Sequence, residues 1–122
     1  MYSRRTLGDL RQRASQTEQA AAWITFTGTG TPVPDDSNLV TSITDNGVGD
    51  YTLTWAQAFA STNYVMIGGG RNDGAGDNAQ GHVAFQAVAS PQTAASCRIA
   101  TYNRALTAAD FGTVNVAVWG RR

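Results

Sequence analysis

The fold of this chain follows from the stretch Ser42-Ile43-Thr44-Asp45-Asn46-Gly47-Val48-Gly49-Asp50-Tyr51-Thr52-Leu53-Thr54-Trp55. Two runs with alternating apolar residues, 39–44 and 51–55, flank a turn made of Asp, Asn and Gly. Asn46, Gly47 and Gly49 suit positive φ angles, while the carboxylates of Asp45 and Asp50 can accept hydrogen bonds from nearby groups. These residues predict an antiparallel hairpin with a bulged loop of about four to six residues rather than a minimal two-residue turn.

The rest of the chain after residue 21 continues with the two-residue period of strands. We expect strands at 22–27, 39–44, 51–55, 64–69, 82–88, 97–102 and 114–119, separated by clusters of Gly, Pro, Asn and Asp. Many short strands of this kind predict an all-β fold, an antiparallel β-sandwich of about seven to eight strands. One set of residues is expected to supply the core and the contacts between subunits: Trp23, Ile24, Phe26, Ile43, Tyr51, Leu53, Trp55, Tyr64, Met66, Phe85, Ile99, Val114, Val116 and Val118.

Residues 3–21 are predicted to form the only real helix. Its apolar and small residues recur at spacings of three and four, as in a heptad seam. The seam consists of Leu7, Leu10, Ala14, Thr17 and Ala21. A helix of this length is marginal alone in water and needs a surface to lie on. Its own β-domain, other copies of the chain and a larger partner are all candidates, and we favour the last two.

The charged residues of the chain are unevenly distributed. Net charge is zero over 122 residues, so no overall field favours nucleic acid or an anionic membrane, and neither is expected as a partner. All nine basic residues are Arg. Four of them, Arg4, Arg5, Arg11 and Arg13, lie in the first 15 residues. We therefore expect two parts, an attaching or oligomerising helix at 1–21 and a β-sandwich domain at 22–122.

A glycine-rich stretch at 68–78 is the most distinctive loop. It lacks the Gly-Lys-Ser/Thr of a phosphate-binding loop and the ligand ladder of an EF-hand. A looser calcium site, a plain hairpin loop and a surface that recognises a sugar or a protein remain open. For receptor binding the candidates are Arg71, Asn72, Asp73, Asp77, Asn78, Tyr102, Asn103 and Arg104.

Catalytic signatures are missing from the sequence. His82 is the only His and Glu18 the only Glu, and no nucleophile motif surrounds Ser90, Ser96 or Cys97. Cys97 is instead expected to be a small core residue. We predict neither an enzymatic activity, nor a cofactor, nor a metal, nor a segment that inserts into a membrane. The segment Thr107-Ala108-Ala109-Asp110 is predicted to form one capped helical turn.

Aromatic residues on the predicted strands allow two interpretations. Trp55 and Trp119, together with Tyr51 and Tyr102, could form a sugar-binding face. Such residues more often belong to the core or to a subunit interface, and we favour that interpretation.

Three segments together resemble a known family. They are Ala22-Trp23-Ile24-Thr25-Phe26-Thr27-Gly28-Thr29-Gly30-Thr31, the hairpin Asp45-Asn46-Gly47-Val48-Gly49-Asp50-Tyr51-Thr52, and Asn63-Tyr64-Val65-Met66-Ile67-Gly68. This pattern is similar to a small β-domain of tail-fibre and related virion proteins of tailed bacteriophages. The resemblance covers 22–70 and, loosely, the final strand, whereas 1–21 and 71–110 lie outside it and the spacer 32–36 departs from it.

The resemblance implies a structural protein of the virion, assembled in the host cytoplasm, rather than a chemistry. We expect a short fibre, spike or decoration subunit that is trimeric, because the domains it resembles are trimeric. Its N-terminal helix would contact other virion proteins of the capsid, portal or tail, and its β-domain would face outward toward a host surface glycan. A free-standing carbohydrate-binding module, with the helix packed on its own domain, is the alternative.

Overall fold

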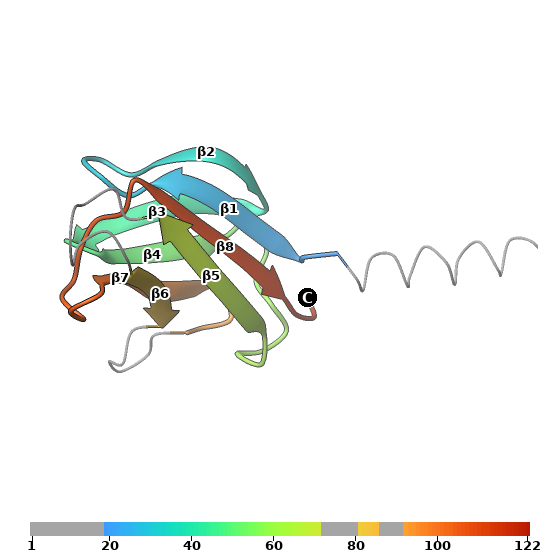
Figure 1. Ribbon diagram of the computed structural model, residues 1–122. Coiled ribbons are helices and arrows are strands. Elements are labelled where there is room, and N and C mark those ends of the chain that lie inside the picture. The colour runs from blue at the N-terminus through green and yellow to red at the C-terminus, as the bar shows by residue number, and fades with distance from the viewer. Residues whose placement is uncertain (1–18, 72–80, 86–91) are drawn as a thin grey trace, which may run out of the picture.

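The described residues form two β-sheets packed face to face (Figure 1). A computed structural model describes residues 19–71, 81–85 and 92–122. Sheet A has the strand order β2-β1-β8-β5 and sheet B the order β3-β4-β7-β6. Their bounds are β1 Ala22–Thr27, β2 Val33–Asn38, β3 Val40–Gly47, β4 Asp50–Trp55, β5 Val65–Arg71, β6 Gly81–Phe85, β7 Ser96–Asn103 and β8 Thr113–Trp119.

Every pair of neighbouring strands is antiparallel, and the predicted antiparallel β-sandwich is confirmed. The edge strand β5 contacts β6, and β2 contacts β3, so the two sheets approach each other along both edges. The predicted helix over 3–21 lies mostly outside the described residues. Its last three residues, 19–21, are described and are not helical.

The hairpin β3–β4 is present but tighter than predicted. Gly47 pairs with Asp50, which leaves only Val48 and Gly49 as the loop. The expected bulge is there, because the register shifts between Asp45 and Gly47. The prediction of a longer loop was wrong because residues 45–47 continue the ladder instead of leaving it.

Side chains of the predicted turn residues stabilise this hairpin from within. The Asp45 carboxylate accepts a hydrogen bond from the Gly47 amide at 3.0 Å. The Asn46 side-chain amide donates to Thr52 Oγ1 at 2.8 Å and to Asp50 Oδ1 at 3.3 Å. The sequence predicted that the carboxylates of Asp45 and Asp50 accept hydrogen bonds from nearby groups, and these contacts confirm it.

Strand β2 was not predicted. Its sequence, Val-Pro-Asp-Asp-Ser-Asn, lacks apolar alternation, and it was interpreted as a spacer. It forms because it is the outer edge of sheet A, where Pro is tolerated and charged side chains reach water. The ladder to β1 shifts register between Thr25 and Phe26, opposite Pro34.

The core lies between the sheets and matches the predicted set closely. Sheet A contributes Ile24, Phe26, Val114, Val116 and Val118, and sheet B contributes Tyr51, Leu53, Trp55, Cys97 and Ile99. The sequence missed two aromatic residues in connections, Phe59 and Phe111, which are also buried. Trp23 is instead 36% exposed on the outer face of sheet A, and the side chain of Phe85 lies outside the described part.

Gly49 occupies the most restrictive backbone position of the hairpin. Its φ is +61°, and a Cβ there would lie 2.5 Å from the Thr101 carbonyl oxygen and 2.8 Å from the Ala109 nitrogen. Gly30 offers a comparison, because its φ is +67° but a Cβ would meet nothing within 4 Å.

We predict that Gly49→Ala lowers the free energy of unfolding more than Gly30→Ala does. The left-handed conformation alone should cost about 1–2 kcal/mol in both variants. Only Gly49→Ala must also displace packed backbone, which should add about 1–3 kcal/mol. Urea denaturation of both variants measures the difference, and equal losses would contradict this view of the hairpin.

Candidate functional site

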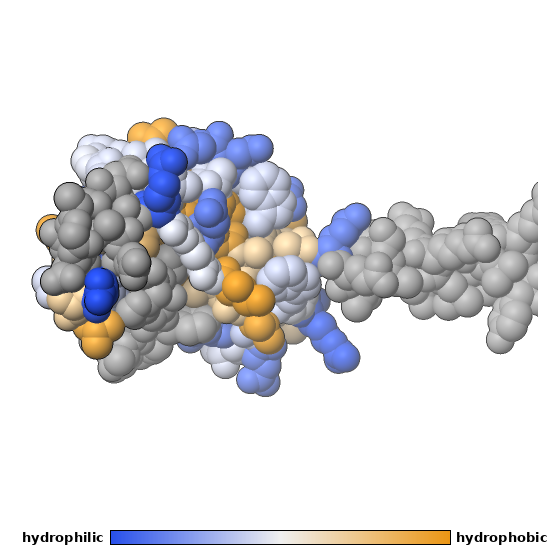
Figure 2. Space-filling view, in the orientation of Figure 1, coloured by the Kyte–Doolittle hydropathy of each residue, from blue (hydrophilic) through white to orange (hydrophobic). Residues whose placement is uncertain are grey.

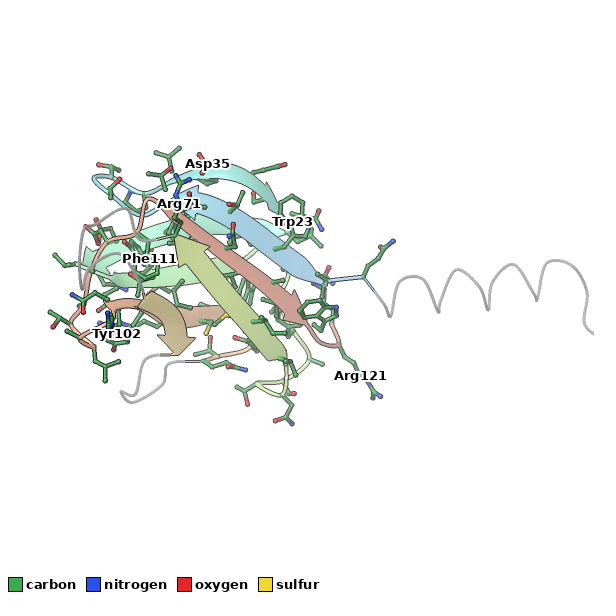
Figure 3. All side chains as sticks on the ribbon, in the orientation of Figure 1. Trp23, Asp35, Arg71, Tyr102, Phe111 and Arg121 are labelled. Carbon is green, nitrogen blue, oxygen red and sulfur yellow. The ribbon has the colours of Figure 1, made fainter. Side chains whose placement is uncertain are left out.

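Different segments of the chain lie at the two ends of the sandwich. At one end, here called the proximal end, the chain enters β1 and leaves β8: the Ala21 amide donates to the Val118 carbonyl at 2.7 Å, and the Ala60 amide donates to the Arg121 carbonyl at 2.8 Å. The opposite, distal end holds the hairpin loop 48–49 and the connections 28–32 and 104–112. Figure 3 shows Trp23 and Arg121 toward the proximal end and Arg71, Phe111 and Tyr102 toward the distal end.

The described receptor candidates all lie at the distal end. Arg71 is exposed at the last position of β5, opposite Thr113, and Arg104 is exposed just after β7. Tyr102 is half-buried and bridges to Ala108. The remaining loop candidates, Asn72, Asp73, Asp77 and Asn78, lie outside the described residues.

Asn103 has a structural role at this end. It is only 7% exposed, and its side-chain oxygen accepts a hydrogen bond from the Thr107 amide at 3.0 Å. Its backbone amide donates to the Thr107 carbonyl at 2.9 Å. Asn103 therefore shapes the loop that displays Arg104. The predicted capped helical turn at 107–110 was wrong, because Ala108 pairs with Tyr102 in an extended bridge.

A buried polar cluster joins the distal connections to both sheets. The Tyr51 hydroxyl lies 2.8 Å from the Gly28 carbonyl oxygen and 2.8 Å from the Asp110 carboxylate. The same carboxylate accepts a hydrogen bond from the Gly49 amide at 2.8 Å. Burial raises the pKa of Tyr51, and the hydrogen bond to Asp110 raises it further. Tyr51 thus stays protonated and connects sheet B to Asp110, in the connection before β8.

A second cluster lies toward the proximal end. The Tyr64 hydroxyl lies 2.7 Å from the Thr93 carbonyl oxygen and 2.9 Å from that of Ser96, and accepts a 3.3 Å hydrogen bond from Trp55. Burial raises the pKa of Tyr64 to about 12 and that of the Cys97 thiol to about 12. A thiol with such a pKa carries almost no thiolate at neutral pH and is chemically inert.

The charged side chains of the described residues form one close ion pair with one another and no metal-binding cluster. No group of three His, Cys, Asp or Glu side chains that could hold a metal ion occurs within 19–71, 81–85 and 92–122. The most prominent charged contact is the pair of hydrogen bonds from Arg98 to Asp50, at 2.8 and 2.6 Å on the outer face of sheet B. It reinforces the β4–β7 ladder beside the hairpin. The His82 side chain lies outside the described part.

The core interpretation is confirmed for Tyr51 and Trp55, so the four aromatic residues do not form one sugar-binding face. Tyr51 and Trp55 point into the core, whereas Trp119 and Tyr102 point outward from different sheets. The structure instead brings Trp23 to the outer face of sheet A, beside a shallow hollow of about 420 Å³. Trp23 faces outward because Ala22 and Ile24, its neighbours in β1, face inward.

Comparisons with known proteins give no relative for this chain: no family model, curated protein or solved structure matches it significantly. Among the described residues, no helix is long and apolar enough to cross a membrane.

The raised pKa values predict a loss of stability in alkali. A group whose pKa is raised by folding contributes its full stabilisation below its unfolded-state pKa and loses it as the pH rises toward the folded-state value. The free energy of unfolding should therefore be level to about pH 8 and fall as the pH passes 9.0, for Cys97, and 10.0, for Tyr64.

Urea denaturation at a series of pH values measures this dependence. The control is Cys97→Ala, in which the decline should begin near the tyrosine value instead of the cysteine value, whatever the stability at neutral pH. If the decline begins at the same pH in both proteins, burial does not raise the pKa of the Cys97 thiol.

Proposed function

We propose that this chain is a structural subunit of a tailed-bacteriophage particle, a short fibre, spike or decoration protein. The N-terminal segment, residues 1–21, associates with other copies and attaches the subunit to the particle. The β-sandwich faces outward and presents its distal end to a host surface. The assembly is a trimer, as the resemblance of residues 22–70 to phage fibre domains implies.

The observation that carries this proposal is the separation of the two ends. The N-terminal segment joins the sandwich at the proximal end, where the Ala21 amide bonds the Val118 carbonyl. Arg71 and Arg104 lie at the distal end, a full strand length away. A subunit attached through its first residues would therefore hold its candidate recognition loops away from the particle.

The all-β fold is compatible with the same role. Antiparallel sandwiches present loops at their ends, and binding residues are commonly carried on loops over a rigid scaffold. Hydrogen bonds donated by Tyr51 and accepted by Asp110 and Asn103 hold the described distal connections in place without a ligand.

A free carbohydrate-binding module is the second candidate. The hollow on sheet A favours it, because Trp23 stands beside the polar pair Thr25 and Asn115, whose side chains are 2.6 Å apart. An aromatic ring with neighbouring hydroxyl and amide groups can bind a sugar. Binding of the monomeric protein to a glycan array, without association with particles, would favour this candidate over the first.

We predict that the full chain is a trimer and that Leu7→Asp combined with Leu10→Asp makes it monomeric. Two carboxylates in an apolar seam must be desolvated without partners, which opposes helix association. Sedimentation equilibrium measures the mass, and thermal unfolding followed by circular dichroism should show the β-domain still folded.

The matched control is Gln12→Asp combined with Gln16→Asp, which adds the same charge outside the seam. This control should remain a trimer. In particles purified from infected cells, antibody against the β-domain should label the surface for the wild-type and control proteins and not for the seam variant. Labelling that survives in the seam variant would contradict attachment through the N-terminal segment.

A further inference from the structure

The outer faces of the two sheets differ sharply in chemistry. On sheet B, one row across three strands is Thr44, Thr52 and Arg98, all suited to water. On sheet A, the corresponding row is Ile67, Ala117 and Trp23. Since both rows point away from the core, packing between the two sheets does not explain the difference.

The apolar residues of sheet A form a continuous patch near the proximal end. Val65 and Ile67 on β5 are 61% and 60% exposed, and Trp23 on β1 is 36% exposed. Trp119 completes the patch, because it pairs with Val65 across the β5–β8 ladder. Figure 2 shows hydrophobic side chains gathered over β5 on this face. Toward the distal end the same face becomes polar.

The patch has a raised part and a hollow part. Val65 and Ile67, here called the ridge, are exposed along the edge strand β5, and Ile67 lines one side of the hollow. Beside it, the hollow of about 420 Å³ lies over small residues, Gly69 and Ala117, and Trp23 also lines it. In a closed ring, each copy contacts its neighbour through two different surfaces. A ridge on one copy and a hollow on the next are two such surfaces.

The N-terminal segment enters β1 beside this patch. Ala21 was predicted to end the seam, but it is not helical and packs against the core, and its amide donates to Val118, the residue next to Trp119. The seam is narrow, with two positions in seven, which is typical of helices that pack on other helices. A helix that covers its own sheet needs a wider apolar stripe. If the N-terminal helices of several copies associate along the seam, their β-domains would therefore come into contact at the proximal end of sheet A.

We propose, on the basis of the assembly described above, that the outer face of sheet A contacts a second copy of this chain. The ridge of Val65 and Ile67 on one copy enters the hollow beside Trp23 on the next. The β-domains thereby continue the contact that begins in the N-terminal seam, and their polar faces on sheet B remain in water.

The test uses the full chain with Ile67→Asp, and Thr44→Asp on the outer face of sheet B as the matched control. Ile67→Asp should raise the dissociation constant of the assembly at least about tenfold, because a carboxylate would be buried against an apolar hollow. Thr44→Asp should leave it unchanged. Sedimentation equilibrium over a range of concentrations measures both.

A second measurement is needed because the dissociation constant would not change if the seam alone held the copies together. A spin label on Ile67→Cys should give shorter distances between copies than one on Thr44→Cys, and Cys97 is buried and should not react. If the wild-type chain is an oligomer but Ile67→Asp matches its control and the two label positions give equal distances, this interface is wrong and the proposed function stands. If the wild-type chain is a monomer at every concentration, the proposed assembly fails together with the interface.

Discussion

The hydroxyl of Tyr51 makes the contact on which the distal half of the molecule depends. It comes from sheet B and lies within hydrogen-bond distance of both the Gly28 carbonyl, at the end of β1, and the Asp110 carboxylate. A hydroxyl has one hydrogen to donate, and a charged carboxylate is the stronger acceptor. Asp110 also accepts from Gly49 in the hairpin loop. The pair of Tyr51 and Asp110 thus joins the hairpin to the connection before β8.

Much of the fold could be predicted because its strands alternate clearly. Val114, Val116 and Val118 face inward as their period requires, and the hairpin was recognised from its Asp, Asn and Gly residues. Strand β2 could not be found, because an edge strand needs only backbone pairing and leaves no apolar period. The prediction of a helical turn at 107–110 was wrong because backbone groups of this segment make hydrogen bonds to Thr101 and Asn103 instead of to one another.

The candidate sites were less predictable than the fold. The candidate recognition residues were sought in the glycine-rich stretch 68–78 and at 102–104, but the burial of Asn103 depends on a turn that closes on Thr107. Trp23 was included among core and interface residues together, since β1 has apolar side chains on both faces. Periodicity cannot say which face is inside in such a strand. Only the pairing of β1 with β8 shows that Trp23, Ala117 and Ile67 share one outer row.

Among the described residues, apolar side chains lie both in the core and on the outer face of sheet A. The core between the sheets is closed, whereas apolar side chains on sheet A face outward beside the point where the N-terminal segment arrives. Burial of such a patch is the usual driving force for association. In the proposed assembly, the inward face of sheet A packs within the chain, and its outward face packs between chains.

The most direct test of this claim is the exposure of tryptophan in the full-length chain as it is diluted. Trp55 is 4% exposed and reports the core, whereas Trp23 and Trp119 report the outer face of sheet A. The account predicts that fluorescence quenching by iodide is weak in the assembled protein and rises as dilution separates the copies, and that Trp23→Phe reduces this rise. Quenching that is equally strong before and after the copies separate would contradict it.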